Sequence, residues 1–109
     1  MRTLKFIVND QRIEQDPNCD FSGLVPGTEE YLIAEFRFSK EWNGYTKVAT
    51  FRSMLGKEHP PQLLKDGRTC VIPAEALKKR KFEIGVVGRR NKQKLLTHTV
   101  TVCQNGGNE

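Results

Sequence analysis

Apolar and polar residues alternate with a period of two along much of this chain, and this pattern predicts β-strands. The clearest segment is 31–38, where Leu32, Ala34, Phe36 and Phe38 fall on one face. A helix would spread these side chains around its circumference, whereas a strand places every second residue on the same side. Shorter segments of the same kind predict further strands at residues 4–8, 11–14, 46–52, 62–65, 68–72, 82–87 and 95–102.

Turn sequences separate these predicted strands. Asn9-Asp10, Asn43-Gly44 and Asp66-Gly67 are all typical of tight reversals, and in Asp66-Gly67 the glycine is expected to supply a positive φ. The Asp66-Gly67 turn therefore predicts a hairpin between the strands at 62–65 and 68–72.

The remaining segments lack the alternation. Residues 16–28, and the region around Gly56 and Pro60-Pro61, are rich in proline, glycine and asparagine and predict loops. Residues 73–78 begin with a proline and continue with good helix formers, which predicts one short helical turn. Residues 104–109 predict a flexible tail or linker.

Together these elements predict an all-β fold, an antiparallel two-sheet sandwich of the immunoglobulin-like kind with seven or eight short strands. A chain of 109 residues supports one such domain, which we place at residues 1–103. Trp42 is expected to be a large buried anchor at one end of the sandwich. Gly44 and Gly67 are expected to be structural anchors of the two tight reversals.

The charge of the chain is concentrated in one region. The net charge is +5, but residues 78–94 hold eight basic residues against the single acid Glu83, so this segment carries +7 and the rest carries −2. The candidate partner-binding residues are these eight: Lys78, Lys79, Arg80, Lys81, Arg89, Arg90, Lys92 and Lys94.

The two halves of this basic segment are predicted to lie at opposite ends of one strand. Residues 82–87 separate them by roughly 20 Å, at ~3.3 Å per residue. Grooves for single-stranded nucleic acid usually combine basic residues with exposed aromatic residues, which are few here. We therefore expect solvated hairpin ends, or docking onto an acidic protein partner, more than direct contact with nucleic acid, which stays open as a minor alternative.

The residues that could carry catalysis do not form a recognisable set. Cys19, Cys70 and Cys103 are widely spaced, which predicts buried or half-buried thiols and requires no disulfide. His59 is expected to be solvated in a loop, and His98 to be structural near the apolar face or its rim. A pair of Cys103 with His98 is rejected because the two lie on opposite faces of one predicted strand.

Other chemistry is equally hard to support. There is no Cys-x-x-Cys or His-x-x-x-His pair for zinc, and no glycine-rich loop leads from a strand into a helix. Glu29 and Glu30 could be imagined as an acid/base pair, but adjacent residues on a strand edge point to opposite faces. We therefore expect a protein that is not an enzyme and that uses no cofactor or metal. The sequence also shows no membrane span and no signal peptide, so the expected locations are the cytoplasm of a host cell or a virus particle.

Several segments occur in an order that resembles a small β-sandwich domain of phage and prophage proteins from Gram-positive bacteria. They are Phe38-Ser39-Lys40-Glu41-Trp42-Asn43-Gly44, Asp66-Gly67, Ile72-Pro73-Ala74-Glu75-Ala76-Leu77, Phe82-Glu83-Ile84-Gly85-Val86-Val87-Gly88 and Thr97-His98-Thr99-Val100-Thr101-Val102. Similar segments recur in this order at the start of tail, baseplate and fibre proteins. The resemblance covers residues 4–102.

The resemblance implies a structural or assembly role in a bacteriophage particle, through self-association or contacts with other tail proteins. A second hypothesis comes from the charge of residues 78–94. It is a small phage-encoded inhibitor or accessory protein that uses its basic hairpin to bind a host complex for handling nucleic acid, such as a defence complex.

Overall fold

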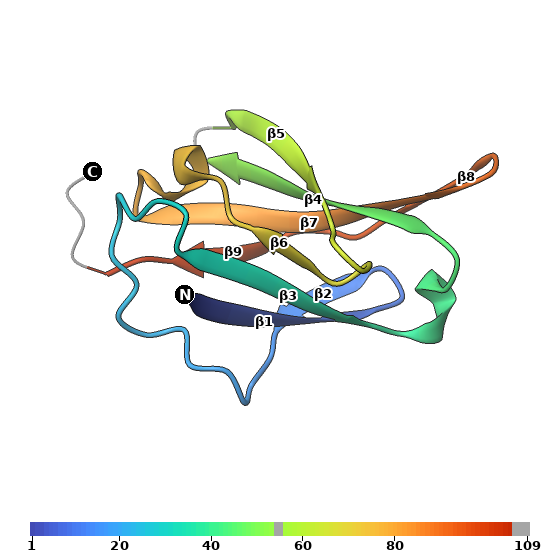
Figure 1. The fold of residues 1–109 in the computed structure, drawn as a ribbon, viewed down its shortest axis with the longest axis horizontal. Helices are drawn as coiled ribbons and strands as arrows, with labels where there is room; N and C mark the ends of the chain where they lie inside the picture. The colour runs from blue at the N-terminus through green and yellow to red at the C-terminus, as the bar shows by residue number, and fades with distance from the viewer. Residues whose placement is uncertain (54–55, 106–109) are drawn as a thin grey trace.

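The computed structural model describes residues 1–53 and 56–105 and consists mainly of β-strands (Figure 1). The described part has nine strands and two short 3-10 helices, which confirms the predicted all-β class. The strands are β1 (Arg2–Asn9), β2 (Arg12–Gln15), β3 (Leu32–Phe38), β4 (Thr46–Ser53), β5 (Glu58–Leu63), β6 (Thr69–Val71), β7 (Lys81–Arg90), β8 (Gln93–Leu96) and β9 (Val100–Cys103). The 3-10 helices are η1 (Lys40–Trp42), which was not predicted, and η2 (Ala74–Leu77), which is the predicted helical turn.

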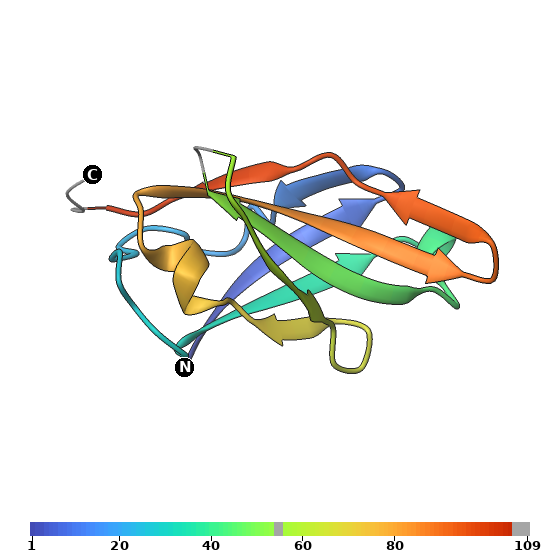
Figure 2. The ribbon, with the colours of Figure 1, turned by 90° about the horizontal axis from the view of Figure 1, so that it is seen from above.

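The strands form the two packed sheets that were predicted. One sheet has the order β2-β1-β3-β6, and the other has the order β5-β4-β7-β8, with β9 also paired to β7. All pairings are antiparallel except β1 with β3, which is parallel over seven residue pairs. A parallel pair needs a long connection, and here the connection contains β2 and the loop at 16–31. Figure 2 shows the strands of the two sheets crossing at an angle.

Large aromatic side chains fill the space between the sheets. Phe6 stacks on Phe36 with ring centroids 5.4 Å apart, and Phe36 in turn stacks on Phe38. Phe38 lies 5.2 Å from Trp42, which is fully buried and donates from Nε1 to the carbonyl oxygen of Asp10 at 2.7 Å. Trp42 therefore joins the end of β1 to η1, as expected of a buried anchor.

The strand predicted at 95–102 is two strands, β8 and β9, which pair with different parts of β7. Between them Thr97 is tied to Val86 by a backbone and a side-chain hydrogen bond. This interruption changes which side chains face inward. One continuous strand at 95–102 would turn Leu96, Val100 and Val102 inward together, but Leu95 packs against the core and Leu96 is 43% exposed, so this part of the prediction is wrong.

The same interruption affects His98. The sequence placed it near the apolar face, but the residue is exposed in the segment between β8 and β9. Its Nδ1 lies 3.0 Å from the carbonyl oxygen of Thr99. The prediction for His98 was wrong because it assumed one continuous strand, in which every second residue faces the same side.

The prediction of a loop at Pro60-Pro61 is wrong, since both prolines lie within β5. Strand β5 is the edge of its sheet, and its register with β4 shifts between Ala49 and Phe51. Proline cannot donate to a ladder, so it is tolerated at an edge strand or a bulge, and this site is both. The adjacent His59 is buried rather than solvated, and its Nε2 lies 2.7 Å from Ser53 Oγ.

Both glycine turns form as predicted, but one of them connects different elements. Gly44 has φ +82°, and Asp66 and Gly67 have φ +52° and +67°. The Asp66-Gly67 turn joins β5 to β6, which belong to different sheets, so it is not a hairpin within one sheet. Only the single bridge between Lys65 and Thr69 pairs the two sides of the turn.

The ordered chain continues past the predicted domain end at Cys103. Gln104 is buried, and its Nε2 donates to the carbonyl oxygens of Leu77 at 3.0 Å and Lys79 at 2.8 Å. The backbone N–H of Asn105 donates to the carbonyl oxygen of Leu24. Of the predicted tail, residues 106–109 lie outside the described part of the chain. No helix among the described residues is long and apolar enough to cross a membrane.

Candidate protein-binding surface

The β7–β8 hairpin carries the second half of the basic segment at one end of the molecule. Figure 1 shows this hairpin projecting along the long axis. Arg89 is the direct partner of Lys94 across the hairpin, and Arg90 is the partner of Gln93. Asn91, at the turn, has φ +56°, a conformation that asparagine tolerates better than most residues. The turn sequence thus sets the register that brings these cations together.

Arg90 is held in place by its neighbours. Its guanidinium lies 4.7 Å from the ring centroid of Tyr45 and donates to the carbonyl oxygen of Asn43 at 3.2 Å. It also donates to Gln93 Oε1, which accepts a second hydrogen bond from the Tyr45 hydroxyl. Gly44, with φ +82°, forms the turn against which the Arg90 side chain packs. Arg90 therefore stiffens the hairpin directly beside its turn.

Arg89, Lys92 and Lys94 are exposed, and in the part of the chain that the structure describes no acidic side chain pairs with them. We call these three residues the hairpin end. Like charges on directly opposed strand positions are destabilising, so the pairing of Arg89 with Lys94 has a cost. Local features that oppose stability are more common at functional sites. The hairpin end is therefore the candidate site.

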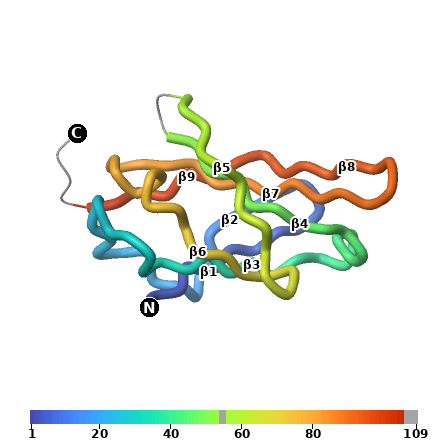
Figure 3. The backbone as a smooth tube through the Cα atoms, turned by 45° about the horizontal axis from the view of Figure 1, so that its top comes forward, coloured from blue at the N-terminus to red at the C-terminus, as the bar shows by residue number. Residues whose placement is uncertain are grey.

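The first half of the basic segment lies at the opposite end of β7. This strand is ten residues long, which corresponds to ~30 Å, so the predicted separation of the two halves is confirmed and is somewhat larger. Figure 3 shows that the η2–β7 connection and the β8 hairpin lie at opposite ends. The structure thus does not bring together the eight candidate residues. The four at this end are Lys78, Lys79, Arg80 and Lys81, all exposed.

The surroundings of these four residues differ from those of the hairpin end. The loop at 16–30 has four acidic and no basic residues, and it contacts this region through a hydrogen bond from Gly27 N–H to the carbonyl oxygen of Leu77. The carbonyl of Arg80 accepts the backbone N–H of Gln104. This backbone contact joins a loop rich in acids to the η2 end of the basic segment.

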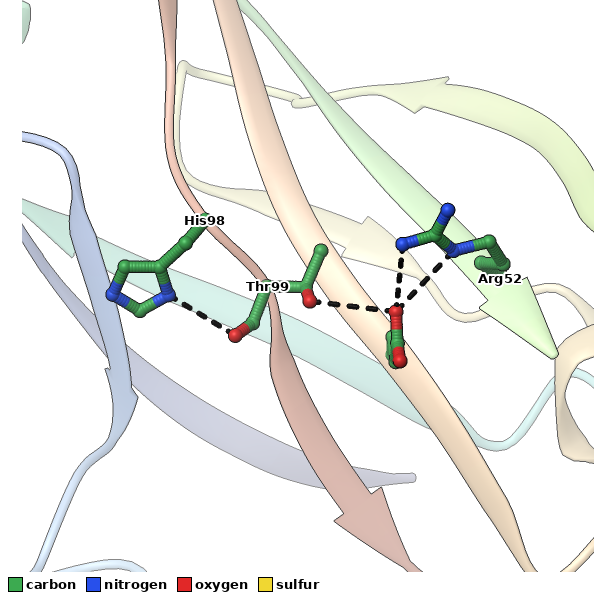
Figure 4. Close-up of polar contacts among 4 residues, drawn as sticks. Arg52, His98 and Thr99 are labelled. Atoms are coloured by element: carbon green, nitrogen blue, oxygen red, sulfur yellow. Dashed lines mark hydrogen bonds and ion pairs between the residues drawn. The ribbon is translucent and has the colours of Figure 1, made fainter. Parts of the chain in front are cut away.

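The one acid within the basic segment is itself neutralised. Glu83 Oε1 accepts from Arg52 Nη2 at 2.9 Å and from Arg52 Nε at 3.2 Å, with Thr99 Oγ1 at 3.4 Å (Figure 4). An exposed ion pair of this kind contributes at most about 1 kcal/mol. Glu83 is six residues from Arg89 along β7, roughly 20 Å, so it does not offset the charge of the hairpin end.

Sequence reasoning missed two residues beside the hairpin, Tyr45 and Lys47. Lys47 Nζ donates to the carbonyl oxygen of Tyr45 at 3.1 Å and lies 5.2 Å from the ring centroid of Phe38. Partial burial lowers the pKa of Lys47. The proximity of Tyr45 to the Asn43-Gly44 turn was visible in the sequence, but its partner Arg90 lies 45 residues later, where only the strand pairing could reveal it.

The groups with catalytic potential are few in the described residues. Ser53 and His59 form the pair noted above, and Ser53 N–H also donates to the carbonyl oxygen of Lys57 at 2.8 Å, so the pair closes the connection between β4 and β5. No group of three or more possible metal-ligating side chains occurs within residues 1–53 and 56–105.

The three cysteines are free and differ in exposure. Cys70 is buried, Cys19 is half-buried, and Cys103 is exposed on β9, which corrects the prediction of buried or half-buried thiols for all three. Cys103 is exposed because its neighbour Val102 takes the inward position. Burial raises the pKa of Cys70 from 9.0 to about 12.

We expect the raised pKa of Cys70 to make the free energy of unfolding fall between pH about 9 and about 12. The unfolded chain loses this proton first as the pH rises, so stability is complete below pH 9 and decreases above it, by up to about 1.4 kcal/mol per pH unit. Urea unfolding of the wild type and of Cys70→Ala at several pH values measures the difference. If the two proteins show the same slope in this interval, the Cys70 thiol is not protected.

No protein family model and no curated protein matches this chain. The sandwich and the hairpin end are therefore described from the chain's own residues. They define an all-β module with an exposed cationic hairpin.

Proposed function

We propose that this chain is a non-enzymatic structural or assembly module of a phage or prophage particle, in a tail, baseplate or fibre protein. It acts through protein–protein contacts made by the hairpin end. The ordered segments from Phe38 to Val102 support the phage setting, as does their resemblance to the sandwich domains of such proteins. The particle or the host cytoplasm is its place of action.

A single observation carries the binding role. The hairpin end presents Arg89, Lys92 and Lys94 with no acidic partner among the described residues, next to a turn stiffened by the contacts of Arg90 with Tyr45 and Gln93. A preorganised charged surface loses little conformational freedom on binding, and it attracts a partner of opposite charge. An acidic protein surface fits this chemistry.

The test is incorporation into particles. Particles purified from the strain that encodes this chain are expected to contain the wild type. The triple variant Arg89→Glu, Lys92→Glu and Lys94→Glu is expected to be incorporated at least tenfold less. The matched control reverses three charges at the other end, Lys78→Glu, Lys79→Glu and Lys81→Glu, and is expected to be incorporated normally.

Two outcomes contradict this proposal. The first is the absence of the wild-type chain from purified particles, measured by mass spectrometry. The second is equal incorporation of the hairpin-end variant. The exposed cations also favour the second candidate function, an inhibitor of a host nucleic-acid-handling complex. That function predicts a chain absent from particles, with salt-dependent binding to nucleic acid or to a nucleoprotein.

A further inference from the structure

An apolar row crosses the outer face of the five-stranded sheet. Strand pairing aligns Leu63 of β5 with Val48 of β4, Val48 with Val87 of β7, and Val87 with Leu96 of β8. Side chains at directly paired positions lie on the same face of a sheet. Leu63 is 66% exposed and Leu96 is 43% exposed. We call these four residues the outer row.

The outer row is not part of the hydrophobic core. The neighbours of its two central valines, Ala49 after Val48 and Val86 before Val87, are buried in the core. Because adjacent residues of a strand face opposite sides, Val48 and Val87 face away from the core. The four strands place the ends of the row ~14 Å apart, at ~4.8 Å between strands. The row is thus a continuous apolar strip on an uncovered sheet face.

At its β5 end the row meets a shallow depression. Leu63 lines this depression of about 280 Å³ together with Ile33, Val71 and Lys65. Val71 is 42% exposed. The apolar strip therefore continues over the edge of the sandwich, where a lysine borders it.

The next row of the same face is basic. Two residues further along the strands, Thr46 is paired with Arg89, and Arg89 with Lys94. The hairpin end and the outer row thus lie side by side, one charged and one apolar. Two acids on this face, Glu58 of β5 and Glu83 of β7, lie in the other direction and are both strand partners of Arg52, with which Glu83 forms an ion pair.

We infer that the outer row and the hairpin end form one docking surface for an acidic amphipathic segment of a partner protein. This rests on the proposed function and names the partner's chemistry. Apolar side chains of the segment would cover the outer row, and its carboxylates would meet Arg89 and Lys94. Charge complementarity selects this occupant over the same face of a second copy, because both faces would carry Arg89, Lys92 and Lys94. The outward residues of β4, β7 and β8 include no aromatic side chain for stacking bases.

The experiment measures peptide binding by the full chain with fluorescence anisotropy. The probe is a helical peptide of about 18 residues with leucines on one face and glutamates on the other, which is longer than the row at ~1.5 Å per residue. Two matched peptides replace the glutamates by lysine or the leucines by serine. We expect the acidic amphipathic peptide to bind, and each replacement to weaken binding at least tenfold.

Two double variants test the surface. Leu63→Gln with Leu96→Gln removes the exposed ends of the outer row, and Arg89→Glu with Lys94→Glu reverses its charged border. Each is expected to weaken peptide binding at least tenfold. The control, Val25→Gln with Tyr31→Gln, changes two apolar residues exposed elsewhere and is expected to bind as the wild type does.

Several outcomes overturn the inference. One is a dissociation constant above about 1 mM for the acidic amphipathic peptide. Others are unchanged binding by the outer-row variant, a DNA duplex that displaces the peptide, or a dimer in sedimentation velocity that the outer-row variant abolishes. If the serine peptide binds as well as the leucine peptide, the charged hairpin end acts alone. The proposed function then still stands, since particle incorporation tests it separately.

Discussion

Replacement of Trp42 by alanine is expected to lower the free energy of unfolding by about 3–5 kcal/mol. The ring is fully buried and contacts both Phe38 and Tyr45, so its removal leaves a large cavity at the end of the aromatic row. The carbonyl of Asp10 also loses its hydrogen-bond donor. Urea unfolding followed by far-UV circular dichroism measures the loss, because the variant contains no tryptophan for fluorescence.

The variant Trp42→Phe separates these two effects. It keeps most of the buried apolar volume but cannot donate to Asp10, so we expect a smaller loss of about 1–3 kcal/mol. If the free energy of unfolding falls by less than ~1 kcal/mol in Trp42→Ala, the prediction is contradicted. Either neighbouring side chains then fill the space that the ring occupied, or the ring is exposed to solvent.

Replacement of Gly88 by alanine is expected to destabilise the domain by about 1–3 kcal/mol, although alanine usually suits a strand better than glycine. A Cβ at this position would lie 2.8 Å from Trp42 Cζ3 and 3.1 Å from Tyr45 Cδ2. These rings are held by packing and cannot move away without disturbing η1. The same urea unfolding measurement gives the value.

Gly85→Ala is the matched control on the same strand. Its Cβ would lie 3.3 Å from the Thr50 and Thr99 side chains and from the carbonyl oxygen of His98, on the outer face, where small shifts are easier. We expect a smaller loss than for Gly88→Ala.

A double-mutant cycle of Trp42→Ala with Gly88→Ala is more decisive. The new Cβ fits into the cavity, so we expect the alanine at 88 to cost at least ~1 kcal/mol less in that background. If the two substitutions lower the free energy of unfolding additively, the close contact between position 88 and the Trp42 ring is contradicted.

The sequence was sufficient to predict those strands whose alternation is uninterrupted and whose ends carry strong turn residues. Strand β3 begins one residue later than predicted, and Asn43-Gly44 and Asp66-Gly67 both form turns. These features depend on local preferences, which a single chain segment contains. The burial of Trp42 also followed, because one large ring beside a tight turn has few other favourable places.

Features that depend on partners distant in the sequence could not be predicted in this way. The change of facing between Leu95 and Val100 depends on how β7 is shared by β8 and β9. Pro60 and Pro61 are tolerated in β5 because this strand is at the edge of its sheet.

The candidate site shows the same division. Its charges, and the separation of the basic segment into two ends, were readable in the sequence. The opposition of Arg89 to Lys94 and the alignment of Leu63 with Val48, Val87 and Leu96 were not. They are consequences of register, and the apolar residues of the outer row lie up to 48 residues apart in the chain. Each of these residues alone resembles an ordinary surface position.

The two prolines of β5 also constrain how copies of this domain can be joined. An open sheet edge offers backbone amides that recruit another strand, which is a common start of amyloid-like growth. Pro60 and Pro61 have no amide hydrogen, so strand-by-strand stacking has no continuous template along this side. At high local concentration, the β5 edge therefore resists uncontrolled polymerisation through strand addition.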